Sequence, residues 1–334
     1  MTVVVTGASG HLGVNLVRAL VAEKRPVHAL VHVNKQTVEG LGAEIVSGNI
    51  CDVDSLCRAF EGAEVVYHLA AVISLLKSEW HLVEAVNVIG TRNVVEACLR
   101  CGVKRFVHFS SIHALEQAPF DTPVDESRPL VESRQHPPYD RSKAAGEKEV
   151  RKGIEKGLDA IIINPTGVIG PYDYQPSHFG TALLSMANGK IPALIDGGFD
   201  WVDVRDVVKG AMQAERLAPS GSKYLLSGHW VSMRDMAGMV KEITDASIPG
   251  FVCPMPLAQL GAPVATACNR LLGRRPLFTT VSLKALNSNH HVSHEKAIRE
   301  FGYQPRPFRE TLFETLKWFA EAGKLKCKLK SESC

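Results

Sequence analysis

A tyrosine stands four residues before a lysine in the stretch PPYDRSKAAGE, residues 137–147. The two prolines favour the start of a helix, and residues four apart on a helix lie one above the other on the same face. A phenol has a pKa of about 10, and a nearby ammonium favours the ionised form and lowers that pKa. Tyr139 is therefore a candidate general acid for carbonyl reduction and base for the reverse reaction, and Lys143 is the candidate that tunes it.

A pair of serines ends the apolar run KRFVHFSS, residues 104–111. We expect this run to be a buried strand, so Ser110 and Ser111 fall at the carboxyl edge of a sheet, where ligands bind in doubly wound folds. A hydroxyl there can hold a substrate oxygen beside the phenol of Tyr139, although a serine in this place can also be a simple turn or cap residue. We take Ser111 as the third candidate catalytic residue.

The stretch TGASGHLG, residues 6–13, has the glycine spacing of a dinucleotide-binding turn and lies between an apolar run and a helical pattern. Gly7 is expected to make the tight turn, Gly10 to admit a pyrophosphate and Gly13 to pack closely against the strand. The free amides of the following helix favour phosphate. His11 is expected either to contact a phosphate or to cap the helix. The expected cofactor contacts of the turn are Gly7, Ser9, Gly10, His11, Leu12 and Gly13.

The end of the second apolar run decides between the two nicotinamide dinucleotides, because an acid there would hold the ribose 2′-hydroxyl. The sequence at 30–36 is LVHVNKQ and contains no acid. His32 and Lys35 can instead pair with a 2′-phosphate, or they can be solvated loop residues. We expect NADP(H) to be preferred over NAD(H).

Short apolar runs alternate with longer segments whose apolar residues recur every three or four positions. The runs, expected as buried strands, cover 2–7, 26–33, 43–48, 63–71, 104–111 and 158–165, and the clearest helical patterns cover 11–23 and 79–100. This alternation predicts an α/β fold: a Rossmann, doubly wound parallel sheet with a smaller mixed α/β C-terminal substrate lobe. The predicted Rossmann domain is 1–165, with 199–216 returning to it. The predicted lobe is 166–198 and 217–325, and 326–334 is predicted to be a flexible tail.

Composition excludes several classes of protein. The net charge is +3, with 38 basic and 35 acidic residues and no long block of one sign, so no nucleic-acid partner is expected. No leader or spanning segment is apparent, so we expect a cytoplasmic protein with no membrane partner. Cys98 and Cys101 form a CxxC without a second pair, and no metal site is expected.

The chain resembles the extended short-chain dehydrogenase/reductases, most closely the branch of dihydroflavonol reductases and 3β-hydroxysteroid dehydrogenases. The resemblance rests on the motifs TGASGHLG, GNICD, YHLAA, NVIGTRNVVEA, FSS, YDRSK, NPTGVIGP and WVDVRDVV, which occur in the family's order. It implies a triad of Ser111, Tyr139 and Lys143, with Lys143 also on the nicotinamide ribose. It further implies cofactor contacts from Asn49, Ile50, Leu69, Ala70, Ala71, Pro165, Thr166 and Val168. The family usually has Asp at the Asn49–Ile50 segment, so the adenine contact is expected to differ.

Three functions remain open within this resemblance. The first is an oxidoreductase with net hydride transfer between NADP(H) and a small-molecule carbonyl or alcohol. The second is a nucleotide-sugar epimerase or dehydratase that uses the same triad and retains its cofactor, and the third is a cofactor-sensing binding protein. The acidic pair of the dehydratases is replaced by Ile112 and His113, and 172–201 contains Lys190 as its one basic residue apart from His178. Both features favour the first function.

The long connection between Ser111 and Tyr139 is expected to form one wall of the substrate pocket. His113 in this connection and Tyr172 beyond it are the candidate substrate contacts. A homodimer through the helices at 79–100 and 139–155 is implied by family analogy alone.

Overall fold

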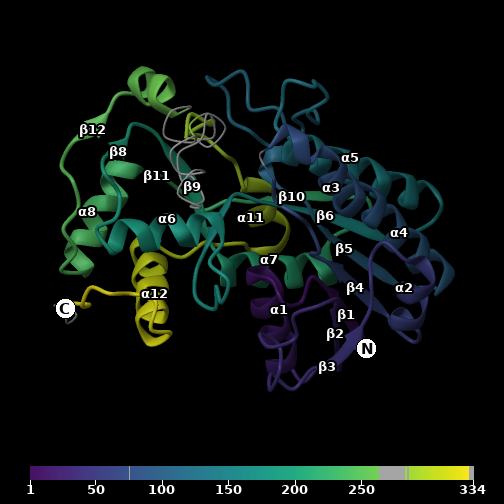
Figure 1. Ribbon diagram of the computed structural model, residues 1–334. Coiled ribbons are helices and arrows are strands. Elements are labelled where there is room, and N and C mark those ends of the chain that lie inside the picture. Colours follow the sequence, from purple (N-terminus) through teal and green to yellow (C-terminus); the bar gives the residue numbers. More distant parts are fainter. Residues whose placement is uncertain (75, 263–282, 284–285, 331–334) are drawn as a thin grey trace.

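The fold is built around one large parallel sheet (Figure 1). The computed structural model describes residues 1–74, 76–262, 283 and 286–330. The seven strands of the sheet run in the order β10-β6-β5-β4-β1-β2-β3. Their bounds are β1 Val3–Thr6, β2 Val27–Val31, β3 Glu44–Ser47, β4 Val65–His68, β5 Arg105–Phe109, β6 Ala160–Pro165 and β10 Lys223–Leu226.

The six expected strands are all present, and the predicted doubly wound fold is confirmed. Strands β1, β4, β5 and β6 are buried along their whole length, which is typical of parallel strands covered by helices on both faces. β3 lies at the edge of the sheet, and three of its four residues are exposed.

Helices cover both faces of this sheet (Figure 1). On one face lie α1 (His11–Ala22), α7 (Val204–Leu217) and α11 (Glu295–Phe301), and their apolar residues share one buried cluster with the strands. On the other face lie α2 (Val53–Phe60), α4 (Thr91–Arg100) and α5 (Pro138–Glu155), which contribute to a second cluster. The long helices thus bury one side each and leave the carboxyl edge of the sheet open to ligands.

The segment 79–100 is less regular than the single predicted helix. It contains α3 (Trp80–Val83), a π-helical stretch at Glu84–Gly90 and then α4. Asn87 lies in the π-helical stretch, and its side chain bonds outward to Ser142 and Val72. Stretches of π-helix often occur at functional sites, and this one faces the helix that carries Tyr139.

A second, smaller lobe lies beside the sheet and has its own apolar core (Figure 1). Its three-stranded sheet has the order β11-β9-β7, and β8 pairs with β12. The strands are β7 Gly167–Ile169, β8 Leu194–Ile195, β9 Gly198–Asp203, β11 His229–Ser232 and β12 Val252–Cys253. The helices with described bounds are α6 His178–Ala187, α8 Met233–Ile243 and α12 Phe308–Glu321.

The structure differs from the expected division of the chain in three places. Two elements of 217–325, the segment assigned to the lobe, belong to the large domain: β10 pairs in the large sheet, and α11 packs on it. In the returning segment 199–216 the helix α7 packs on the large sheet, but β9 pairs within the lobe. The described part of the tail is bound, because Lys330 N donates to Ile243 O at 2.8 Å and Lys328 N to Asp245 Oδ1 at 2.9 Å. Among the described residues, no helix is both long and apolar enough to cross a membrane.

Candidate active site

The glycine turn between β1 and α1 closes against the end of β4. Gly7 has a φ of +68°, and a Cβ there would lie 2.6 Å from the backbone N of Ala70. A Cβ on Gly13 would lie 2.2 Å from Gly7 O. The residue that caps α1 is Gly10, which has no side chain to occupy the helix amides. This cradle of bare backbone at a helix N-terminus fits the pyrophosphate of a dinucleotide.

The expected contacts from 69–71 lie beside this turn. Leu69 N donates to Thr6 O at 3.2 Å, and Ala70 N donates to Thr6 Oγ1 at 3.4 Å. The segment is held from its other side by Asn87, whose Oδ1 accepts from Val72 N at 2.8 Å. The structure therefore brings the segment and the glycine turn together at one edge of the sheet.

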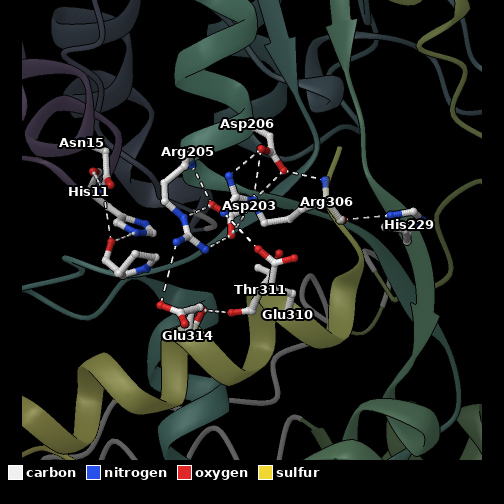
Figure 2. Close-up of polar contacts among 12 residues, drawn as sticks. His11, Asn15, Asp203, Arg205, Asp206, His229, Arg306, Glu310, Thr311 and Glu314 are labelled. Carbon is white, nitrogen blue, oxygen red and sulfur yellow. Dashed lines mark hydrogen bonds and ion pairs between the residues drawn. The ribbon is translucent and has the colours of Figure 1, made fainter. Parts of the chain in front are cut away.

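His11 and Tyr172 have other neighbours than the sequence predicts. His11 Nε2 lies 3.0 Å from Pro171 O, which also accepts from Asn15 Nδ2 at 3.1 Å (Figure 2). The imidazole thus ties the turn to the first residues of the second lobe. Tyr172 packs on α1, with the Arg18 guanidinium 4.0 Å from its ring centre.

The remaining expected adenosine-side contacts lie at the ends of β1, β2 and β3. Ser9 O accepts from Thr37 Oγ1 at 3.1 Å, and Leu12 packs against the core. His32 and Lys35 are exposed, and Lys35 Nζ pairs with Glu39 Oε1 at 3.3 Å, an acid that the sequence argument did not consider.

After β3, Asn49 Oδ1 accepts from Cys51 N at 2.9 Å. Ile50 packs beside Gly90 of the π-helical stretch, where a Cβ would lie 2.8 Å from Ile50 Cδ1. Both residues are partly exposed at the ligand edge of the sheet.

Ser111, Tyr139 and Lys143 meet at the carboxyl end of β5. Ser111 is buried, its Oγ accepts from His113 N at 3.2 Å, and its hydroxyl lies beside the phenol of Tyr139. Tyr139 is half-buried in the first turn of α5. Lys143 is buried one turn later, and its Nζ donates to Phe109 O at 2.6 Å.

The pKa values of this group depart from the expectation of a lowered phenol pKa. Burial raises the pKa of Tyr139 to about 12; the nearby Ser111 hydroxyl opposes this shift, and the Asp140 carboxylate adds to it. Burial lowers the pKa of Lys143 to about 8, opposed by the nearby Glu147 carboxylate. Burial is the largest cause of the pKa shift in both cases. The phenol is consequently protonated at neutral pH and can donate.

A small cavity lies next to these residues. Its lining is Ile112, His113, Gln117, Thr166, Gly167, Phe179, Phe199, Asp200, Ser288, Asn289 and Val292. The His113 ring stands edge-on to Tyr139 with 6.2 Å between ring centres. His113 therefore lies between the cavity that it lines and the Tyr139 ring. Tyr172 is not among these lining residues. None of the described lining residues is a lysine or an arginine.

The buried carboxylate of Asp200 was not recognised from the sequence. Its Oδ1 accepts from Thr166 Oγ1 at 2.6 Å and from Gly228 N at 2.8 Å. Burial raises the pKa of Asp200, and these two hydrogen bonds oppose the shift. Its position directly before the motif WVDVRDVV was the one available signal.

The expected nicotinamide contacts follow β6. Pro165 ends the strand, Thr166 lines the cavity, and Val168 is partly buried in β7. The segment therefore lies between the large sheet and the lobe.

A glycine cradle for a dinucleotide and a serine, tyrosine and lysine at the edge of a doubly wound sheet define a Rossmann-fold oxidoreductase. The family profile described as NAD dependent epimerase/dehydratase family matches residues 3–225. Sterol demethylase protein B from Methylococcus capsulatus is 34% identical over 327 residues, covering 97% of this chain and 99% of that protein. A putative dihydroflavonol 4-reductase from Synechocystis is 28% identical, covering 96% and 95%. The crystal structure of gox2253 superimposes with a TM-score of 0.85 at 32% identity, covering 97% and 99%.

The chain belongs to the NAD dependent epimerase/dehydratase family, and it is an enzyme with a nicotinamide dinucleotide cofactor. The resemblance to extended short-chain dehydrogenase/reductases is confirmed.

Proposed function

We propose that this enzyme is an NADP(H)-dependent reductase that transfers a hydride to a carbonyl carbon, with Tyr139 as the proton donor. The observation that carries the proposal is the placement of the Ser111 hydroxyl beside the phenol of Tyr139, next to a cavity without cationic residues in its described lining. A protonated phenol suits the reductive direction, because a carbonyl oxygen must gain a proton as its carbon gains hydride.

Each residue of the site has a distinct part in this scheme. When bound, the nicotinamide supplies the hydride. The Ser111 hydroxyl orients the substrate oxygen beside the phenol, and Tyr139 donates its proton to that oxygen. The Lys143 ammonium stabilises the phenolate that remains. The backbone of the glycine turn and the segment 69–71 bind the dinucleotide.

One wall of the cavity is apolar and favours a neutral substrate with an apolar face, while the remaining lining is polar and includes Asp200. Phe179 and Phe199 form an aromatic wall with 5.0 Å between ring centres, and Ile112 and Val292 add aliphatic surface. A nucleotide diphosphate would call for arginine or lysine, which the described lining lacks. The names of the relatives, a sterol demethylase protein and a putative dihydroflavonol reductase, also suggest cyclic substrates. We therefore propose cyclic ketones as the substrate class.

The first test is consumption of NADPH by the purified enzyme. One panel contains cyclic ketones, including steroid and flavonoid ketones, and a second contains UDP-sugars. The expected result is loss of NADPH absorbance with members of the first panel. Conversion of a UDP-sugar without net loss of cofactor would instead establish the epimerase alternative.

The preference for NADP(H) and the homodimer belong to the same proposal. Lys35 supports the preference for NADP(H), because its ammonium can leave Glu39 and pair with a 2′-phosphate instead. Exposed Leu82 and Ile89 on the α3–α4 segment support the second. Light scattering after size exclusion distinguishes a dimer from a monomer.

A further inference from the structure

Glu147 is a fully buried acid that the proposed chemistry does not use. It lies on α5, one turn after Lys143, and its exposed fraction is 0%. An ionised carboxylate in a protein interior is costly unless charged and hydrogen-bonded partners compensate it. Its partners therefore show what it holds in place.

Two buried side chains bind this carboxylate. Lys223 Nζ of β10 lies 2.7 Å from Glu147 Oε2, and Asn164 Nδ2 of β6 donates to Oε1 at 2.7 Å. Lys223 is 5% exposed and Asn164 is 0% exposed. The three residues come from three elements, so Glu147 fixes α5 against the strands at the far side of the sheet from β3.

Asn164 extends this link to the catalytic serine. The same Nδ2 also donates to the backbone oxygen of Ser111 at 2.8 Å. Lys143 Nζ donates to Phe109 O, at the last residue of β5. The carboxyl end of β5 is thus attached to α5 at two points, one through Lys143 and one through Glu147 and Asn164.

Among the titratable groups around Lys143, Glu147 supplies the negative charge that stabilises its ammonium. His68 on β4 and His108 on β5 lie close to Lys143, and burial lowers the pKa of both far enough to keep them neutral near pH 7. The phenol of Tyr139 is also neutral there. Lys223 on β10 forms an ion pair with Glu147. Glu147 is the one acid that raises the pKa of Lys143 among the described residues.

We propose that Glu147 is a positioning residue for catalysis: its carboxylate keeps Lys143 in the ammonium form and, through Asn164, fixes the main chain of Ser111. This inference rests on the proposed roles of Lys143 and Ser111. A carboxylate that only joined α5 to β10 would give stability without affecting the titration of Lys143, and the two cases are separable by experiment.

The test compares Glu147→Gln with Glu149→Gln on the same helix. The amide introduced by Glu147→Gln can still accept from Asn164, so this variant removes the charge and retains the main-chain link. Glu149 pairs with Arg92 at 2.9 Å and Lys152 at 2.8 Å instead, which makes the second variant a matched control. The double variant Glu147→Gln with Lys223→Met removes both buried charges and guards against a loss of folding caused by an unpaired lysine.

Two readouts follow Lys143. The first is its titration by NMR in protein labelled with ¹³Cε-lysine, assigned by the loss of one signal in Lys143→Arg. We expect its apparent pKa to fall by about one unit in Glu147→Gln, to fall by less in the double variant, which also removes the positive charge of Lys223, and to stay unchanged in Glu149→Gln. The second is the pH profile of kcat/KM with the best ketone, whose alkaline limb should move to lower pH by the same amount.

The outcomes separate this inference from the proposed function. An unchanged Lys143 titration in folded Glu147→Gln overturns the inference, even if ketones are reduced. A shifted titration with an unchanged pH profile overturns its catalytic part. If no ketone is reduced by the wild type, the proposed function fails, and the titration still decides whether Glu147 sets the charge of Lys143.

Discussion

Burial of Lys143 lowers the stability of the protein at neutral pH, and the proposed reaction needs this lysine in its charged form. The residue is 6% exposed, and its ammonium makes one described hydrogen bond, to a neutral carbonyl. Burial lowers its pKa from 10.5 to about 8, which means that the folded protein disfavours the charge that the proposed reaction needs. Residues that are costly in this way are common at active sites.

Replacing Lys143 with Met should make the stability depend less on pH. The unfolded chain binds the lysine proton more tightly than the folded protein, so the wild type gains stability as the pH rises from about 8 to about 10.5. We expect it to gain roughly 2 kcal/mol relative to Lys143→Met between pH 7 and pH 9.5. Urea unfolding at the two pH values measures the difference.

The control for this prediction is Lys152→Met, because Lys152 is an exposed residue of the same helix. Its stability difference from the wild type should stay constant over the same pH range. A constant difference for Lys143→Met as well would refute the assigned burial cost.

Lys35 tests the cofactor preference. Lys35→Glu places a carboxylate where a 2′-phosphate is expected, so the Kd for NADPH should rise about tenfold while that for NADH changes little. Fluorescence titration with each cofactor gives both values. Lys104→Glu is the control. Lys104 is also exposed and ion-paired, but it precedes β5 and so lies at the amino ends of the strands, away from the carboxyl edge where the cofactor is expected. Equal weakening of both cofactors would contradict the preference.

At the scale of elements, two links attach the second lobe to the large sheet. His11 bonds to Pro171 at the start of α1, and Arg306 before α12 bonds to the acids at the start of α7 (Figure 2). Arg306 Nη2 lies 2.8 Å from Asp206 Oδ1, and Arg306 Nε lies 3.5 Å from Asp203 Oδ2. Both carboxylates are buried, so the guanidinium is their main compensation besides Arg205.

Arg306→Met should destabilise the protein by about 3 kcal/mol, because it leaves the buried Asp206 carboxylate without its charged partner, whereas Asp203 keeps Arg205. Chemical unfolding measures this change. Arg309→Met is the comparison, since Arg309 pairs with Glu242 at the surface and its loss should leave the unfolding midpoint nearly unchanged. Similar small effects for both variants would show that the link contributes little.

The elements also explain which parts of the site could be predicted from the sequence. Tyr139 and Lys143 are one turn apart, and the glycine turn is a single short segment, so local spacing was enough to find them. The partners of Glu147 lie 17 and 76 residues away, on strands whose neighbours only the sheet order fixes. β10 was missed for the same reason, because its four residues do not reveal that the strand pairs with β6.

At the scale of the molecule, the cavity joins the two lobes. The connection after β5 contributes His113 and Gln117, the lobe contributes Phe179 and Phe199, and a later segment contributes Asn289. Asn289 Nδ2 donates to Thr122 O at 2.8 Å, so this later segment holds the connection in place. The long connection lines this cavity with Ile112, His113 and Gln117, but no spacing in the sequence indicates its partners across more than 150 residues.

The central claim is that the phenol of Tyr139 donates the proton during reduction. The most direct measurement is the rate of NADPH oxidation by Tyr139→Phe beside the wild type with the best ketone, together with the NADPH Kd of both. We predict a loss in kcat on the order of a thousandfold, with a Kd within about twofold of the wild type. Turnover of the variant at the wild-type rate would contradict the account.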